Sequence, residues 1–317
     1  MDLGMIGLGR MGANMAERLR RGGHRVVGFD PKGNQYQQAN ADTIEHALSL
    51  KALADELQAP RTVWLMVPAG DAVDQTIEAL LHWLMPGDVI IDGGNSNYQD
   101  SLRRAAELAE RHIDYVDCGT SGGVWGLDAG YSLMLGGDAA VLERLRPIFA
   151  SLAPAAERGW GRVGPNGAGH FTKMIHNGIE YGLMQAYAEG FSLLQHKTEF
   201  ALDLHQIAEI WRHGSVVRSW LLDLSAVALG QNPALDGIAP VVADSGEGRW
   251  TVIEALELGV AAPVITLAML ARLRSRDPSS FSDKLLAALR QQFGGHEIIK
   301  EPSKEPGKAQ TEARAKE

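Results

Sequence analysis

The sequence predicts an α/β domain with a doubly wound, mostly parallel sheet, followed by an all-α domain. Two observations support this prediction. In the first half, short β-branched runs alternate with amphipathic segments, as in repeated βαβ units. After the glycine-rich passage 159–169 the strand pattern stops and only helical patterns follow. We expect the α/β domain to cover residues 1–165, the all-α domain residues 166–300, and a disordered tail residues 301–317.

The strand-like runs of the first half are rich in apolar and β-branched residues and lie between segments of helical period. The run 62–67 is apolar on both faces, as expected for a central parallel strand that helices cover on both sides. The predicted strands are 3–6, 25–29, 62–67, 89–92, 115–117 and 133–135. The predicted helices between and after them are 11–21, 72–84, 99–112 and 139–152.

The second half shows helical period only, beginning with one long segment. The predicted helices are 168–195, 204–211, 216–229, 250–258, 263–274 and 281–293. The segment 301–317 is polar and has no large apolar residue, so we expect it to be disordered and to carry no catalytic group.

Composition excludes several classes of protein. The 317 residues are 45% hydrophobic and include one cysteine, Cys118, which cannot form an internal disulfide and therefore favours a reducing cytoplasm. The start of the chain lacks a signal-peptide pattern, and no apolar run reaches the roughly 20 residues of a membrane span, so we expect a soluble, cytoplasmic protein. The net charge of -9 argues against a general nucleic-acid binder. A local arginine cluster still permits an anionic small molecule.

A glycine-rich loop follows the first predicted strand and precedes the first predicted helix. It reads Gly7-Leu8-Gly9-Arg10-Met11-Gly12, and Asp30 ends the second predicted strand about 20 residues later. This arrangement predicts a Rossmann dinucleotide site, in which the loop holds the pyrophosphate and the acid binds the adenosine ribose. Asp30 would repel a 2'-phosphate, so NAD is favoured over NADP, although Lys32 lies close enough to offset part of that repulsion. The alternative is an ordinary turn and a solvated strand end.

Five polar residues share one face of the predicted helix that begins at 168. Lys173, His176, Asn177, Glu180 and Tyr181 follow the spacing i, i+3, i+4, i+7, i+8. Lys173 and Glu180 are thus separated by about 10 Å along the axis, which suits a short linear substrate and two separate proton transfers. The alternative is a solvated helix face with an exposed lysine and glutamate.

Several further motifs make the sequence resemble a known family. They are Asp92-Gly-Gly-Asn-Ser96, Gly119-Thr-Ser-Gly-Gly-Val-Trp-Gly126, Lys173-Met-Ile-His-Asn-Gly-Ile-Glu-Tyr-Gly182, Gly248-Arg-Trp-Thr251 and Arg290-Gln-Gln-Phe-Gly-Gly-His296. Together with the glycine-rich loop, they are similar to the decarboxylating 6-phosphogluconate dehydrogenase family of the β-hydroxyacid dehydrogenase superfamily. The length resembles its short, NAD-linked branch.

The resemblance implies an activity and two catalytic residues. The reaction is the oxidative decarboxylation of 6-phospho-D-gluconate to D-ribulose 5-phosphate and CO2 with reduction of NAD, a step of the pentose phosphate pathway and of gluconate utilization. Lys173 would take the proton of the C3 hydroxyl and then hydrogen-bond the keto oxygen. Glu180 would protonate C1 of the product. The resemblance implies no metal.

The resemblance also assigns binding residues. Ser121, Gly122 and Gly123 would hold the substrate carboxylate, and His176 and Asn177 its hydroxyl groups. Asn95 would contact both substrate and cofactor, and Val67 would contact the cofactor. The phosphate would be bound by Tyr181 and Arg272, and by Arg290 and His296 from the second subunit of a homodimer. Whether dimers pair into tetramers is left open.

One segment departs from the family pattern. The long-chain relatives carry a phosphate-binding lysine and threonine where this chain reads Asp244-Ser-Gly-Glu-Gly-Arg-Trp-Thr251. Ser245 or Arg249 are candidate replacements. Two other functions stay open: a 3-hydroxyisobutyrate-type dehydrogenase, which does not decarboxylate, and a non-catalytic dinucleotide-sensing protein.

Overall fold

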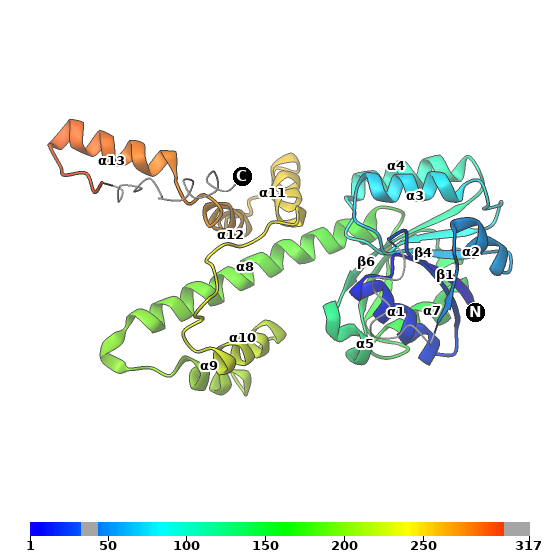
Figure 1. Cartoon of the computed structure of the whole chain (residues 1–317), viewed down its shortest axis with the longest axis horizontal. Helices are drawn as coiled ribbons and strands as arrows, with labels where there is room; N and C mark the ends of the chain where they lie inside the picture. Colours follow the sequence, from blue (N-terminus) through cyan, green and yellow to red (C-terminus); the bar gives the residue numbers. More distant parts are fainter. Residues whose placement is uncertain (33–43, 301–317) are drawn as a thin grey trace, which may run out of the picture.

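The computed structural model describes residues 1–32 and 44–300, and its first half is built on one eight-stranded sheet (Figure 1). The strand order is β3-β2-β1-β4-β5-β6-β7-β8, in which β7 is antiparallel to β6 and the other neighbouring pairs are parallel. The strands are β1 (Asp2–Ile6), β2 (Arg25–Phe29), β3 (Glu45–His46), β4 (Thr62–Leu65), β5 (Val89–Asp92), β6 (Asp114–Ser121), β7 (Ser132–Gly136) and β8 (Trp160–Gly164). The order reverses between β1 and β4, where doubly wound sheets bind their ligands beyond the carboxyl ends of the strands.

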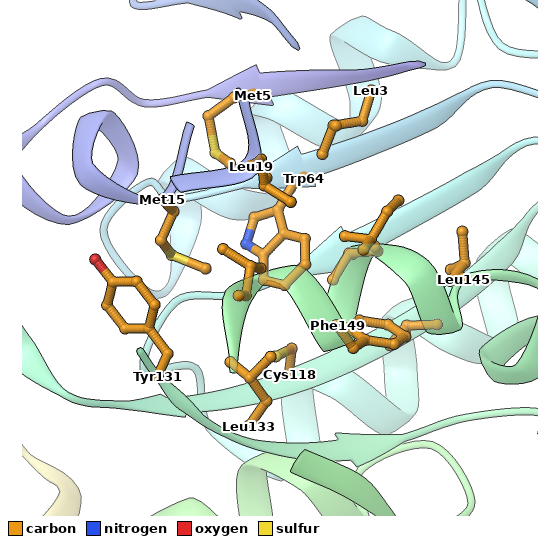
Figure 2. Close-up of a cluster of buried hydrophobic side chains, with 14 of the residues drawn as sticks. Leu3, Met5, Met15, Leu19, Trp64, Cys118, Tyr131, Leu133, Leu145 and Phe149 are labelled. Atoms are coloured by element: carbon orange, nitrogen blue, oxygen red, sulfur yellow. The ribbon is translucent and has the colours of Figure 1, made fainter. Parts of the chain in front are cut away.

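Helices cover both faces of this sheet, because alternate strand residues point to opposite sides. On β4, Trp64 points into one core with Met5, Met15 and Phe149 (Figure 2). The neighbouring Val63 and Leu65 point into the other core. The first core lies under α1 (Arg10–Arg21) and α7 (Arg146–Leu152), and the second under α2 (Leu50–Glu56), α3 (Asp71–Leu80) and α4 (Tyr98–Ala109). The predicted α/β fold with a mostly parallel sheet is confirmed.

Some local predictions were wrong. The predicted helix 139–152 is two helices, α6 (Ala139–Arg144) and α7, because Pro147 near the start of α7 cannot donate the N–H that a continuous helix needs. β8 lies in the passage that we expected to contain no strand. Gly161 and Gly164 weaken its sequence signal, and the observed strand is paired along one edge with β7. The strand β3, the helix α2 and the short α5 (Gly126–Ala129) were not predicted.

The second half is helical, as predicted, and is organised around α8 (Ala168–His196), which extends away from the sheet (Figure 1). α9 (Leu204–Arg212) and α10 (Trp220–Gln231) form a pair near its far end. α11 (Glu247–Glu257) and α12 (Pro263–Arg274) pack along its length. α13 (Phe281–Gly294) has no buried residue and lies apart from the other helices.

The domain boundaries at 165 and 300 stay predictions, and the predicted tail 301–317 lies outside the described residues. Within residues 1–32 and 44–300, no helix combines the length and the hydrophobicity that a membrane span requires.

The N-terminus of α8 is fastened to the sheet by Asp117, a fully buried residue of β6. Its carboxylate accepts hydrogen bonds from the backbone N–H of Gly167 (2.7 Å) and of His170 (2.9 Å). Glycines allow the helix to approach the sheet this closely. A Cβ at Gly169 would lie 2.3 Å from the Asp117 carbonyl oxygen, and a Cβ at Gly136 would lie 2.4 Å from an Asp117 carboxylate oxygen. The start of α8 is therefore held by direct backbone contact.

This contact predicts opposite effects for two glycine substitutions in α8. Gly169→Ala should destabilise the protein by about 3 kcal/mol, because neither the helix nor the strand can move without losing the Asp117 hydrogen bonds. Gly190→Ala is the matched control, since its Cβ would meet nothing within 4 Å and alanine favours a helix by about 0.5–1 kcal/mol. Thermal unfolding of both variants measures the difference. Equal midpoints would contradict the contact.

Candidate active site

A cleft of about 1190 Å³ lies between the carboxyl ends of the strands and α8. It brings together most of the residues that the sequence singled out. The predicted residues that line it are Met11, Asn95, Ser121, Gly122, Gly123, Lys173, His176, Asn177, Glu180, Tyr181 and Arg272. Segments that are far apart in the sequence thus meet at one place.

Glycine occurs at three positions of the loop after β1, and the physical reason for glycine differs from one position to the next. Gly7 has a φ of +91°, and a Cβ there would lie 2.5 Å from the Met66 carbonyl oxygen. A Cβ at Gly12 would lie 1.9 Å from the carbonyl oxygen of Gly7. Gly9 meets nothing within 4 Å and precedes α1. The protein itself requires Gly7 and Gly12, whereas the open space at Gly9 leaves room for a phosphate at the N-terminus of α1.

Asp30 follows β2 beside this loop. Its carboxylate accepts hydrogen bonds from the backbone N–H of Leu8 (2.8 Å) and of Lys32 (2.9 Å). These bonds fix the carboxylate against the loop and leave each oxygen able to accept another hydrogen bond. The loop and Asp30 therefore fit the pyrophosphate and the ribose of a dinucleotide.

The segment after β5 presents Asn95 to the cleft. Asp92, the last residue of β5, is completely buried and accepts hydrogen bonds from the Gly94 N–H (3.1 Å), the Ser96 hydroxyl (2.7 Å) and the Tyr115 hydroxyl (3.0 Å). This network fixes the turn that contains Asn95, which lines the cleft. Val67, predicted beside it, packs at the edge of a core cluster and is not among the cleft-lining residues.

The Ser121-Gly122-Gly123 segment ends β6 and forms another wall of the cleft. Gly122 (φ +137°) and Gly123 (φ +53°) both adopt backbone conformations that favour glycine. The turn lies over the ring of Tyr131, because a Cβ at Gly122 would be 3.1 Å from that ring. Ser121 and the two glycines all line the cleft, as expected for a segment that contacts a ligand.

Lys173 is buried at the start of α8, with a relative exposure of 6%. Burial lowers its pKa, and the carboxylates of Glu180 and Glu247 act in the opposite direction. A lowered pKa increases the neutral fraction that can accept a proton. Lys173 lies close to β6 because residue 119 of that strand is glycine. A Cβ at Gly119 would lie 2.4 Å from the Cβ of Lys173.

The predicted row on α8 is present as a connected series of polar groups. The Lys173 ammonium lies 3.5 Å from His176 Nδ1, which is 3.0 Å from Asn177 Oδ1 and 3.9 Å from Glu180 Oε2. All of these side chains line the cleft. The row therefore offers a base at one end and a carboxyl group at the other.

At the far end of the row, Tyr181 is held by residues of other segments. The guanidinium of Arg272 on α12 lies 3.6 Å from the centre of the Tyr181 ring, and the Tyr181 hydroxyl lies 3.2 Å from Ser245 Oγ. Ser245 lines the cleft, whereas Arg249 forms an ion pair with Asp244. Of the two candidate replacements for the missing lysine and threonine, only Ser245 lies beside Tyr181 and Arg272.

Two predicted phosphate ligands do not reach the cleft of their own chain. Arg290 lies on α13 and His296 follows it, and both are exposed. Neither is among the residues that line the cleft.

Glu247, a buried residue at the start of α11, lines the cleft but was not predicted from the sequence as a site residue. The sequence feature that could have indicated Glu247 is an acidic residue between two glycines, in the segment that departs from the family pattern. Trp125 and Trp220 also line the cleft without having been predicted. Among the described residues, no group of three His, Cys, Asp or Glu side chains is arranged to hold a metal ion.

Comparison with known proteins gives matches to both halves of the chain. Residues 2–161 match the family model of the NAD binding domain of 6-phosphogluconate dehydrogenase, and residues 169–305 match that of the 6-phosphogluconate dehydrogenase C-terminal domain. An NAD(+)-dependent, decarboxylating 6-phosphogluconate dehydrogenase of Haloferax volcanii is 44% identical over 301 residues, which cover 95% of this chain and 99% of the relative.

Two solved structures are similar to most of the chain. A 6-phosphogluconate dehydrogenase of Plasmodium falciparum, studied with NADP+ and with 6-phosphogluconate, has a TM-score of 0.80 and 28% identity, and the match covers 96% of this chain and 67% of that one. A 3-hydroxyisobutyrate dehydrogenase of Mycobacterium tuberculosis has a TM-score of 0.67 and 24% identity, covering 84% of this chain and 90% of that one. The second likeness shows a shared fold.

The charges around Lys173 predict how its titration responds to a substitution. Glu180→Gln should move the pKa of Lys173 downward, because it removes the largest influence that opposes burial. Labelling with acetic anhydride over a range of pH, followed by peptide mass spectrometry, measures the midpoint for Lys173. Glu189→Gln is the control, because Glu189 is exposed and bonds Gln185 further along the same helix. An equal midpoint in Glu180→Gln and the unaltered protein would contradict the assignment.

Proposed function

The chain belongs to the 6-phosphogluconate dehydrogenase family, and on that premise we propose that it oxidises and decarboxylates 6-phospho-D-gluconate to D-ribulose 5-phosphate and CO2 with NAD. One observation carries the proposal for this chain. The row from Lys173 to Tyr181 lies in a single cleft, which also contains Asn95 and the end of the glycine-rich loop at Met11.

Lys173 acts first as a base. Its neutral amine takes the proton of the C3 hydroxyl. NAD, which the glycine-rich loop and Asp30 would hold, would supply the acceptor for the hydride of C3. Burial favours the neutral amine, and the nearby His176 and Asn177 side chains are placed to bind substrate hydroxyl groups and orient C3.

Decarboxylation then uses the same lysine in its charged form. Lys173, now protonated, hydrogen-bonds the C3 keto oxygen, so that the electron pair left by the departing CO2 is stabilised in an enediol. Glu180 protonates the carbon that becomes C1 of ribulose 5-phosphate. The backbone N–H groups of the Ser121-Gly122-Gly123 segment hold the carboxylate before it leaves.

Asp30 sets the cofactor preference. Its carboxylate is fixed against the loop by the Leu8 and Lys32 N–H groups, so it is available to the ribose hydroxyls of NAD. A 2'-phosphate at that position would meet a negative charge, and the backbone bonds prevent the carboxylate from turning away. We therefore expect NAD to be preferred over NADP.

The charges in the cleft support a second subunit in the site. Its lining contains two cations, Lys173 and Arg272, and two carboxylates, Glu180 and Glu247, within the described part of the chain. A substrate with a carboxylate and a phosphate brings more negative charge than this balance can neutralise. Arg290 and His296 of the partner subunit are the proposed additional phosphate ligands.

The surface of α13 supports the same proposal. The helix leaves five large apolar side chains exposed, which a monomer would present to water. They are Phe281, Leu285, Leu286, Leu289 and Phe293. A homodimer that buries this helix against the partner would place Arg290 of the same helix near the partner's cleft. Pairing of dimers into tetramers is left open.

The activity assay tests the proposed function. The unaltered protein should release CO2 from 6-phosphogluconate with NAD and react more slowly with NADP, whereas 3-hydroxyisobutyrate should be a poor substrate. Lys173→Ala should abolish both oxidation and CO2 release, and Glu180→Ala should slow turnover by roughly 100-fold through the missing acid. Turnover of 3-hydroxyisobutyrate in preference to 6-phosphogluconate would favour the alternative dehydrogenase. Absence of any turnover would favour a dinucleotide-sensing protein.

Mixing two inactive variants tests the shared site. In a heterodimer of Lys173→Ala and Arg290→Ala, one cleft carries both defects and the other carries neither. Refolded equimolar mixtures should therefore regain about a quarter of the unaltered activity if subunits pair at random. Each variant refolded alone is the control. If heterodimers form and no activity returns, Arg290 does not act in the partner's cleft.

A further inference from the structure

We propose that Glu247 is a substrate-binding residue, whose buried carboxylate accepts a hydrogen bond from a hydroxyl group of the sugar-acid chain. This inference rests on the proposed function, since it names a further contact to the same substrate. It depends on three features of Glu247: the contacts that fix its position, the shortage of protein donors around its carboxylate, and the sign of its charge.

The start of α11 is held tightly against α8. The Thr251 hydroxyl lies 2.9 Å from the carbonyl oxygens of both Met174 and Glu247. A Cβ at Gly178 would lie 2.6 Å from the Thr251 side chain, so glycine is required there for the two helices to meet. Glu247 is thereby fixed across the cleft from the helix that carries Lys173.

A second close contact fixes the same turn of α11. A Cβ at Gly248 would lie 2.3 Å from the ring of Tyr181. The residues that follow Glu247 in α11 are therefore held at two points, by Tyr181 at Gly248 and by α8 at Thr251. A side chain on such a backbone is well suited to contact a ligand in one defined geometry.

The carboxylate of Glu247 has fewer protein donors than a buried charge requires. Ser245 Oγ donates to Glu247 Oε2 and also contacts the Tyr181 hydroxyl. Within the described residues, Oε1 has no hydrogen-bond partner, and no Lys, Arg or His nitrogen lies within 4.0 Å of the carboxylate. A carboxylate can accept about four hydrogen bonds, and a buried one that lacks them is costly. Glu247 is 3% exposed and lines the cleft, and Oε1 is not among the fully buried atoms without a partner, so this oxygen is open to the cleft. The donors that it lacks among the described residues therefore come from the cleft, from water or from a bound ligand that displaces the water.

The charge of Glu247 decides which part of the substrate it meets. A phosphate or carboxylate group would be repelled, because both carry negative charge and offer only acceptors when ionised. A hydroxyl group donates, and a hydrogen bond to an ionised acceptor is roughly twice as strong as one between neutral groups. The substrate carries hydroxyl groups along the chain between its two anionic ends. Arg272, whose guanidinium lies over the Tyr181 ring, is left to the phosphate.

Substitution with glutamine tests the contact. Glu247→Gln keeps the shape of the side chain and can still accept from Ser245, but it removes the charge. The KM for 6-phosphogluconate should rise about tenfold while kcat changes less than about twofold, because a binding contact is weakened before and during the reaction alike. The KM for NAD should stay the same, and the thermal unfolding midpoint of the unliganded protein should not fall, because the substitution removes a buried charge that lacks donors.

Glu254→Gln is the matched control. Glu254 is a second buried glutamate of α11, it also accepts one hydroxyl hydrogen bond, from Tyr98 (2.8 Å), and it does not line the cleft. Its substitution should leave the KM for 6-phosphogluconate unchanged.

Each other outcome overturns the inference in a different way. A lower KM in Glu247→Gln would mean that Glu247 faces the phosphate and repels it. An unchanged KM with a shifted pH profile of kcat would mean that it acts only through the charge of Lys173. If the unaltered protein failed to turn over 6-phosphogluconate, the proposed function itself would fail, and this result is separate from the behaviour of the variant.

Discussion

The site depends on one buried carboxylate, Asp117, which binds the first turn of α8 to the sheet. A helix N-terminus has N–H groups without partners within the helix, and a negative charge there is favourable. Here that charge comes from the middle of β6, so the sheet and the long helix are joined at a fixed point and angle. All the later helices that pack on α8 derive their positions from this junction.

Glycines then bring the remaining segments within contact distance. Gly119 allows Lys173 to lie against the strand, and Gly178 and Gly248 allow α11 to lie against α8. At each place a Cβ would come within 2.6 Å of another side chain or ring. The same small residues that form backbone contacts therefore position the lysine, the tyrosine and the glutamate of the cleft, and packing and chemistry cannot be varied independently here.

The features that sequence reasoning found are local ones. The glycine-rich loop, Asp30 and the polar row of α8 each occupy a short segment whose period or turn chemistry is visible in the sequence. Glu247 was missed because its burial comes from the contact of Thr251 with Gly178, which are distant in sequence. The strand β8 was missed because its pairing with β7 outweighs a weak glycine-containing segment. The approach of Arg290 and His296 to a cleft would involve another copy of the chain, so no local pattern could place them.

In the proposed mechanism the Lys173 amine first accepts a proton and then, in its protonated form, donates a hydrogen bond to the keto oxygen. Burial favours the neutral amine, which suits the oxidation but disfavours the charged donor that the keto oxygen needs. The carboxylates of Glu180 and Glu247 favour the ammonium form, which suits the decarboxylation. The two influences shift the pKa of Lys173 in opposite directions, and the proposed mechanism uses both forms of the amine. In the proposed mechanism Glu180, which opposes the effect of burial more than Glu247 does, therefore has a use even though the substrate is an anion: it keeps the lysine able to change its charge during the reaction.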